Sequence, residues 1–348
     1  MTSLSDSTVA VILTLLALST PVAHADEYPK ETKAKAICAT VAGFKPGPNA
    51  QPTDEDRKRF AVKTEDCLDY VYGYADPKNR DLDKGRRCCL AQGDCNRELA
   101  MIFANGWGTP RDYDAATFFL CKTDNEMAAF ETWSMLAQLQ VMRSAANPKD
   151  LDYCDYLTSG RGATWCEGLE NSRRTPEWDR RIEAVSQSLG EPAREAFERL
   201  RKAVDDFVEK DADLGAEDSR GGTAHTSFVV VGERERTEAF IGLLERYTRA
   251  PAPRATPEAL RTADRELNTI YQEKLKLPPC PTCGEFTATT RDILRDAQRS
   301  WLRYRDAWTA FYRLRWQGAA PAETLDREID TLLTQDRAAA LRKLGEEN

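Results

Sequence analysis

The chain has 348 residues, with 57 acidic and 49 basic side chains and a formal net charge of −8. This acidic balance argues against a nucleic-acid-binding protein, which needs basic surface to displace the counterions of phosphate groups. Only two histidines are present, which excludes multi-histidine metal sites, and no cofactor is expected.

Residues 1–25 are predicted to be a secretory signal peptide. The apolar run Val9–Leu18 suits the core of such a signal, whereas a membrane span needs about 20 residues. Cleavage is placed after Ala25, behind the small-x-small pattern Ala23-His24-Ala25. The first eight residues depart from the pattern because they hold Asp6 and no basic residue, and a buried N-terminal helix is the alternative. We expect a periplasmic or secreted protein without a membrane anchor.

Residues 26–60 are polar and are predicted to be irregular, and residues 61–170 to form helical hairpins. Arg80-Asp81-Leu82-Asp83 recurs 31 residues later as Arg111-Asp112-Tyr113-Asp114, each time after a turn between helical stretches. A period of about 30–40 residues is typical of an α-solenoid. The segment Leu99–Ala116, with its glycines and small alanines, resembles a Sel-like repeat, a relative of the tetratricopeptide repeat. This resemblance implies contact with another protein.

Ten cysteines in an exported chain predict disulfides. Cys95 and Cys121 are expected to pair, because an antiparallel hairpin brings its two ends together. Cys67 is expected to pair with Cys88 or Cys89. Because these two are adjacent on a helix and face different ways, each is expected to have a different partner. Cys38 is expected to pair with one of the remaining cysteines. Cys154 and Cys166 are expected to pair with each other and to close a local loop. The candidates for structural disulfides are Cys38, Cys67, Cys88, Cys89, Cys95, Cys121, Cys154, Cys166, Cys280 and Cys283.

A second, larger repeat relates residues 176–250 to residues 256–348. A shift of 97 residues aligns the apolar stripe of one amphipathic helix with that of another; it places Phe197, Leu200, Val204 and Phe207 on Leu294, Ala297, Trp301 and Tyr304. Each segment reads as a long helix, a polar turn with glycine and a second helix. We interpret the first as a degenerate copy of the second, with a chance match of two helical periods as the alternative.

Residues 256–348 carry the clearest helical pattern. Thr256 and Pro257 are typical of a helix N-cap and first helical position. A long helix is predicted over Thr290–Arg315, with one apolar stripe. A second face carries arginines with acidic partners three residues away; its charged residues are Arg291, Asp292, Arg295, Asp296, Arg299 and Arg303.

Two segments of this region, Ala263–Tyr271 and Ala297–Trp308, resemble the lysozyme-inhibitor LprI-like family of exported bacterial proteins. The motif residues present are Gln298, Arg299, Trp301, Tyr304, Arg305 and Asp306. The resemblance implies a small α-helical envelope domain, and one branch of the family is named for inhibiting lysozyme. Trp301, Tyr304, Arg305 and Asp306 are candidate binding residues, and core packing of the aromatic rings with an Arg–Asp pair that fixes helices is the alternative.

The predicted fold is all-α: solenoid-like helical hairpins followed by a small helical LprI-like domain. We interpret the chain as a binding protein rather than an enzyme, with lysozyme or another envelope protein as partner and no nucleic acid. The alternatives are a Sel-like scaffold and a thiol–disulfide enzyme that uses Cys280 and Cys283. That C-x-x-C pair also fits a structural disulfide or half of a zinc site.

Overall fold

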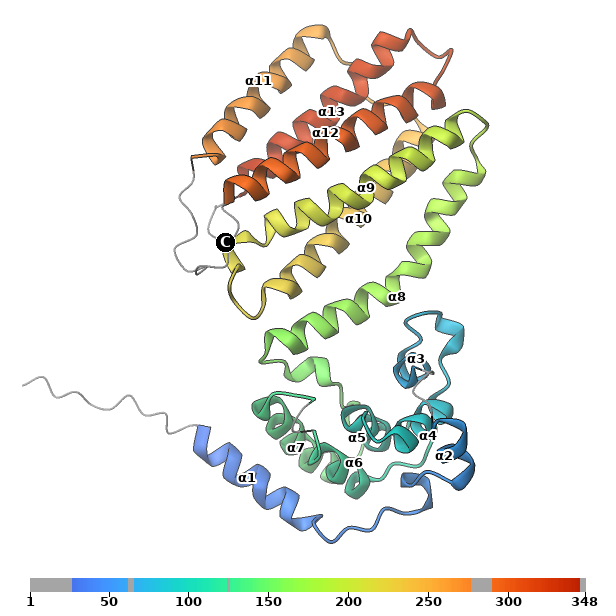
Figure 1. Cartoon of the computed structure of the whole chain (residues 1–348), viewed down its shortest axis with the longest axis vertical. Helices are drawn as coiled ribbons and strands as arrows, with labels where there is room; N and C mark the ends of the chain where they lie inside the picture. Colours follow the sequence, from blue (N-terminus) through green and yellow to red (C-terminus); the bar gives the residue numbers. More distant parts are fainter. Residues whose placement is uncertain (1–26, 62–65, 124–125, 277–289, 345–348) are drawn as a thin grey trace, which may run out of the picture.

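The computed structural model describes residues 27–61, 66–123, 126–276 and 290–344. In these ranges the chain forms α-helices and short 3₁₀ turns and no strand, which confirms the all-α prediction. Figure 1 shows an N-terminal group of short helices below a bundle of long helices, with α8 running between them. None of the helices in the described ranges combines the length and apolar character of a membrane span.

The N-terminal group shares one hydrophobic core. Its helices are α1 (Glu27–Thr40), α2 (Asp54–Arg59), α3 (Cys67–Tyr72), α4 (Leu82–Gln92), α5 (Asn96–Asn105), α6 (Tyr113–Leu120) and α7 (Ala129–Ser144). The prediction of an irregular segment over residues 26–60 is therefore wrong at α1 and α2. The surface of α1 is largely polar and gives little helical signal, but Ala34 is buried and Cys38 is bonded to Cys121, so tertiary contacts hold the helix.

The recurring Arg-Asp motif has a structural explanation. Asp81 accepts a hydrogen bond from the Lys84 amide at the start of α4, and Asp112 accepts from the Ala115 amide at the start of α6. Both are N-caps, a position where aspartate satisfies a free helix amide. Helices α5 and α6 form the expected hairpin, which turns through Gly106 at a φ of 73°. Its assignment to the Sel-like repeats stays a prediction.

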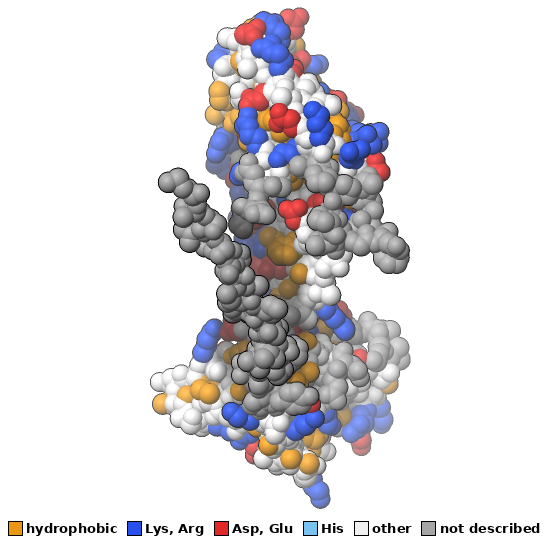
Figure 2. Space-filling view, turned by 90° about the vertical axis from the view of Figure 1, so that its left-hand side faces the viewer, with side chains coloured by type: hydrophobic (Ala, Val, Ile, Leu, Met, Phe, Trp, Pro, Cys, Tyr) orange, Lys and Arg blue, Asp and Glu red, His pale blue; other side chains and the backbone are white. Residues whose placement is uncertain are grey.

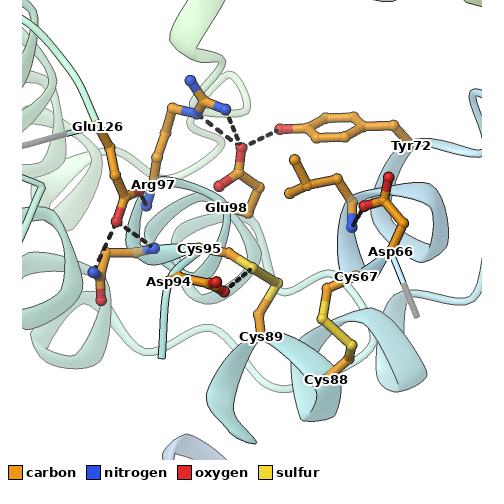
Figure 3. The surroundings of a disulfide bond; sticks show 12 residues. Asp66, Cys67, Tyr72, Cys88, Cys89, Asp94, Cys95, Arg97, Glu98 and Glu126 are labelled. Carbon is orange, nitrogen blue, oxygen red and sulfur yellow. Dashed lines mark hydrogen bonds and ion pairs between the residues drawn. A yellow bond between two sulfur atoms is a disulfide. The ribbon is translucent and has the colours of Figure 1, made fainter. Parts of the chain in front are cut away.

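Four disulfides are present in the described residues: Cys38–Cys121, Cys67–Cys88, Cys89–Cys95 and Cys154–Cys166. The two adjacent cysteines of α4 take different partners, as predicted, and Figure 3 shows both bonds side by side.

The expected pair Cys95 and Cys121 is wrong. The turn between α4 and α5 already brings Cys95 next to Cys89, with 5.3 Å between their Cα atoms, and α1 reaches Cys121 instead. The sulfur atoms of Cys67, Cys89 and Cys95 lie within 4.8 Å of one another, but all three are in disulfides and offer no thiolate to a metal. Cys280 and Cys283 lie outside the described residues, as do residues 1–26.

The C-terminal bundle consists of the end of α8 (Gly160–Gln187), α9 (Ala193–Gly215), α10 (His225–Arg249), α11 (Pro257–Lys274), α12 (Thr290–Arg315) and α13 (Ala322–Arg342). One core runs through all of it, centred on Trp308, Phe311 and Phe197, each fully buried. The segments 176–250 and 256–348 thus share this core. Helices α9 and α12 lie together at its centre, while α8 packs on α10 and α11 packs on α13.

A buried ionic network joins three of these helices. Asp211 of α9 accepts hydrogen bonds from Arg337 of α13 and from Arg236 of α10, the latter at 2.5 Å. The side chains of Asp211 and Arg337 are 8% and 1% exposed. Burial by itself would raise the pKa of Asp211, but the two guanidinium groups overcome it and hold this pKa below its usual value.

Candidate functional site

A groove runs along the bundle between α11 and α12. Helix α11 buries Ala263, Leu267 and Ile270 and packs on α13, which leaves its contact with α12 incomplete. The groove has a cavity volume of about 510 Å³. The residues that line it are Asp264, Leu267, Asn268, Tyr271, Arg295, Gln298, Arg299, Trp301, Leu302 and Arg305. Every one of them belongs to α11 or α12.

Helical spacing explains why these positions share the groove. Asp264, Asn268 and Tyr271 follow one another at four and three residues, and so do Gln298, Leu302 and Arg305. Residues at this spacing lie on one face of a helix. The two faces meet across the groove, so the two sequence segments with the LprI-like motif form one surface.

The floor of the groove is apolar and its rim is charged. Trp301 is buried, whereas Leu302 is 38% exposed and is one of the large apolar side chains that the surface presents. Arginines of the rim have acidic neighbours: Arg295 lies 3.1 Å from Asp292 and Arg299 lies 3.3 Å from Asp296. An apolar centre with a polar rim is the usual anatomy of a protein-binding surface.

Two further contacts fix the groove side chains. The Arg305 guanidinium lies 5.3 Å from the centre of the Trp301 ring, a cation–π contact. The Gln298 side-chain oxygen accepts a hydrogen bond of 3.0 Å from Nε of Arg337, which ties the groove to the buried network of Asp211. The groove is therefore linked to the core of the bundle.

The four predicted site residues divide between the groove and the core. Trp301 and Arg305 line the groove. Tyr304 stacks on Phe207 of α9, with ring centres 4.7 Å apart, and burial raises the pKa of its hydroxyl. Asp306 is exposed and lies 3.0 Å from Arg305. A role of these four residues in binding stays a prediction.

The sequence interpretation missed the polar residues of α11 and the exposed leucine of α12. Asp264, Asn268 and Tyr271 are part of the motif segment Ala263–Tyr271, and their spacing of four and three residues already places them on one face. Leu302 stands next to the buried Trp301 and off the apolar stripe, which is the signal of an exposed apolar side chain.

Comparison with known families decides what this region is. Residues 248–341 match the family described as lysozyme inhibitor LprI. This part of the chain is an LprI domain. It begins at the end of α10 and covers α11, α12 and nearly all of α13. Neither the curated proteins nor the solved structures gave a match.

The lining of the LprI-domain groove is suited to binding. Among the described residues of the lining, the charged ones are Asp264 and three arginines, and they include no pair of carboxylates of the kind that glycosidases use. Guanidinium groups donate paired hydrogen bonds to carboxylates, and Leu302 offers apolar contact beside them. In Figure 2 acidic and basic side chains are interspersed over the bundle, with apolar atoms between them.

Proposed function

We propose that this protein is an extracytoplasmic lysozyme inhibitor that holds its partner at the groove between α11 and α12. The observation that carries the proposal is the match of residues 248–341 to the LprI family, whose two motif segments meet in that groove. The four disulfides support an oxidising compartment such as the periplasm or the exterior.

Inhibition would arise by occlusion of the enzyme's cleft. Lysozyme hydrolyses its substrate with two carboxyl groups in a cleft. The edge of α12 presents Arg295, Arg299 and Arg305 around Leu302, and guanidinium groups are suited to pair with such carboxylates. The excess of acidic over basic residues would also speed the approach of a basic lysozyme.

A lysis assay with the purified, oxidised chain from residue 26 onward tests this function. We expect the wild type to inhibit lysis at micromolar excess, and Leu302→Glu to inhibit at least about tenfold less, because a charge then stands at the apolar centre of the interface. The matched control is Val141→Glu, since Val141 is 58% exposed on α7, outside the groove. Absence of inhibition against several lysozyme types, or equal loss in the control, contradicts the proposal.

A further inference from the structure

The bundle is built from two units of three helices. Helix α8 packs on α10 as α11 packs on α13, and α9 packs on α10 as α12 packs on α13. The central helices α9 and α12 run antiparallel: Phe197 meets Phe311, and further along α9 Phe207 meets Tyr304, which lies earlier in α12. This is the arrangement of two copies related by a two-fold axis.

Two contacts show that the two-fold axis passes between α9 and α12. Phe207 stacks on Tyr304, and Asp206 forms an ion pair with Arg303. Both contacts join residues that are 97 positions apart, the shift that aligns the two segments in the sequence. A residue meets its own counterpart only close to a two-fold axis. The equivalence of α9 and α12 therefore rests on contacts as well as on the apolar period.

The first unit has a groove of its own between α8 and α9, with a cavity volume of about 400 Å³. Five residues of α9 line it, Glu209 and the four residues Arg201, Val204, Asp205 and Val208. The counterparts of these four, 97 positions later, are Gln298, Trp301, Leu302 and Arg305, which line the groove of the LprI domain. The same helix face thus lines both grooves.

The two grooves differ in depth. Val204 stands at the place of Trp301, and a valine fills less space than an indole ring. The groove of the first unit accordingly reaches down to α10, where Glu233 and Phe240 line it. Trp178 and Ile182 of α8 add an apolar wall.

The two grooves also differ in charge. In the LprI domain Asp330 of α13 and Asp306 of α12 both lie close enough to Arg305 to interact with its charge. Their counterparts are Glu233 and Glu209, and both line the groove of the first unit. The counterpart of Arg305, however, is Val208, so the two acidic positions are kept while their arginine is absent.

Glu233 has no cationic partner among the described residues, unlike its counterpart Asp330 near Arg305. In the part of the chain that the structure describes, it forms no hydrogen bond and no ion pair, whereas Glu209 pairs with Lys210 at 2.6 Å. Burial, together with the charge of Glu209, raises the pKa of Glu233. The other charged residues of the lining are Asp179, Asp205, Arg201 and Arg234, and Arg234 is paired with Glu167 at 2.7 Å.

We propose that the groove between α8 and α9 is a second docking site, which takes an arginine or lysine side chain of a protein partner. The cationic group takes the place that Arg305 has in the LprI domain, close to Glu233 and Glu209. The hydrocarbon stem lies along the apolar lining of Val204, Val208 and Phe240. This site lies outside residues 248–341 and does not depend on which partner the LprI domain binds.

A hexa-arginine peptide with a fluorescent label is the probe, and its anisotropy is measured with the full oxidised chain at physiological ionic strength. Val208→Arg supplies the missing cation from the chain itself, and Glu233→Gln removes the carboxylate. We expect each to weaken peptide binding at least about tenfold, a difference of about 1.4 kcal/mol. Glu235→Gln is the control, with the same change of charge at an exposed position of α10.

The carboxyl NMR titration of Glu233 gives a readout that does not depend on the peptide. We expect its pKa to fall in Val208→Arg, because an arginine then faces it from α9. Peptide binding that is unchanged in both groove variants, or weakened equally by Glu235→Gln, overturns the proposal, since only the overall acidity of the protein would then attract the peptide.

Discussion

Asp211→Ala is expected to lower the free energy of unfolding of the C-terminal bundle by about 3–5 kcal/mol. The substitution leaves Arg337, whose side chain is 1% exposed, without its carboxylate partner in the core, and Arg236 loses the same carboxylate. Urea unfolding measures this decrease in the free energy of unfolding, and hydrogen exchange of peptides from α9 and α13 shows that it arises in the bundle.

The matched control for this prediction is Asp206→Ala, on the same helix. Asp206 also pairs with an arginine of the other unit, but its side chain is 38% exposed and that of Arg303 is 59% exposed. An exposed ion pair contributes at most about 1 kcal/mol. Equal losses in the two variants would show that burial of the Asp211 network is not what stabilises the bundle.

The same network sets an expected pH dependence. Because the pKa of Asp211 is lower in the folded than in the unfolded chain, its contribution is complete above the unfolded value of about 3.9. The contribution decreases as the pH falls toward the lowered folded pKa. Wild type and Asp211→Ala should therefore differ most in stability at neutral pH and approach each other in acid.

The second large effect concerns the disulfide between α1 and the end of α6. Replacing Cys38 and Cys121 together by serine is expected to destabilise the N-terminal group by about 4.5 kcal/mol, because the bond closes a loop with a sequence separation of 83. Thermal unfolding of the purified double variant, with hydrogen exchange of α1 and α7 peptides, measures the change.

The disulfide Cys154–Cys166 provides the comparison. Its sequence separation is 12, so the chain-entropy argument predicts a smaller loss of about 3 kcal/mol for the double serine variant. A greater loss in this variant than in the pair Cys38→Ser and Cys121→Ser would contradict the loop-length argument and assign the stabilisation to local contacts.

The long helices were predictable because their signals are local. The expected helix Thr290–Arg315 has the bounds found for α12, and Thr256 accepts a hydrogen bond from the Ala259 amide as an N-cap with Pro257 behind it. The spacing of apolar residues and the capping residues both lie within a few consecutive helical turns, so a short stretch of sequence is enough to recognise them. The shift of 97 residues is of the same kind, since it compares two such periods.

The local pairs Cys67–Cys88 and Cys154–Cys166 were predicted, but the partners of Cys95 and Cys121 and the groove could not be predicted in this way. Cys121 has its partner 83 positions away on α1, and only the folded chain decides which of several thiols lies nearest. The groove exists because α11 packs on α13 and leaves α12 partly uncovered, a choice between two apolar faces that no local pattern contains. Likewise, the predicted boundary between residues 170 and 176 falls inside α8, which continues through Pro176.

The two-fold arrangement of the bundle has a consequence for its assembly. Two separate copies joined through α9 and α12 would form a dimer whose population falls on dilution. Here a single polypeptide carries both halves, so dilution does not separate them. Each molecule therefore always presents one groove of each kind, in a fixed ratio that a mixture of dimers would not maintain.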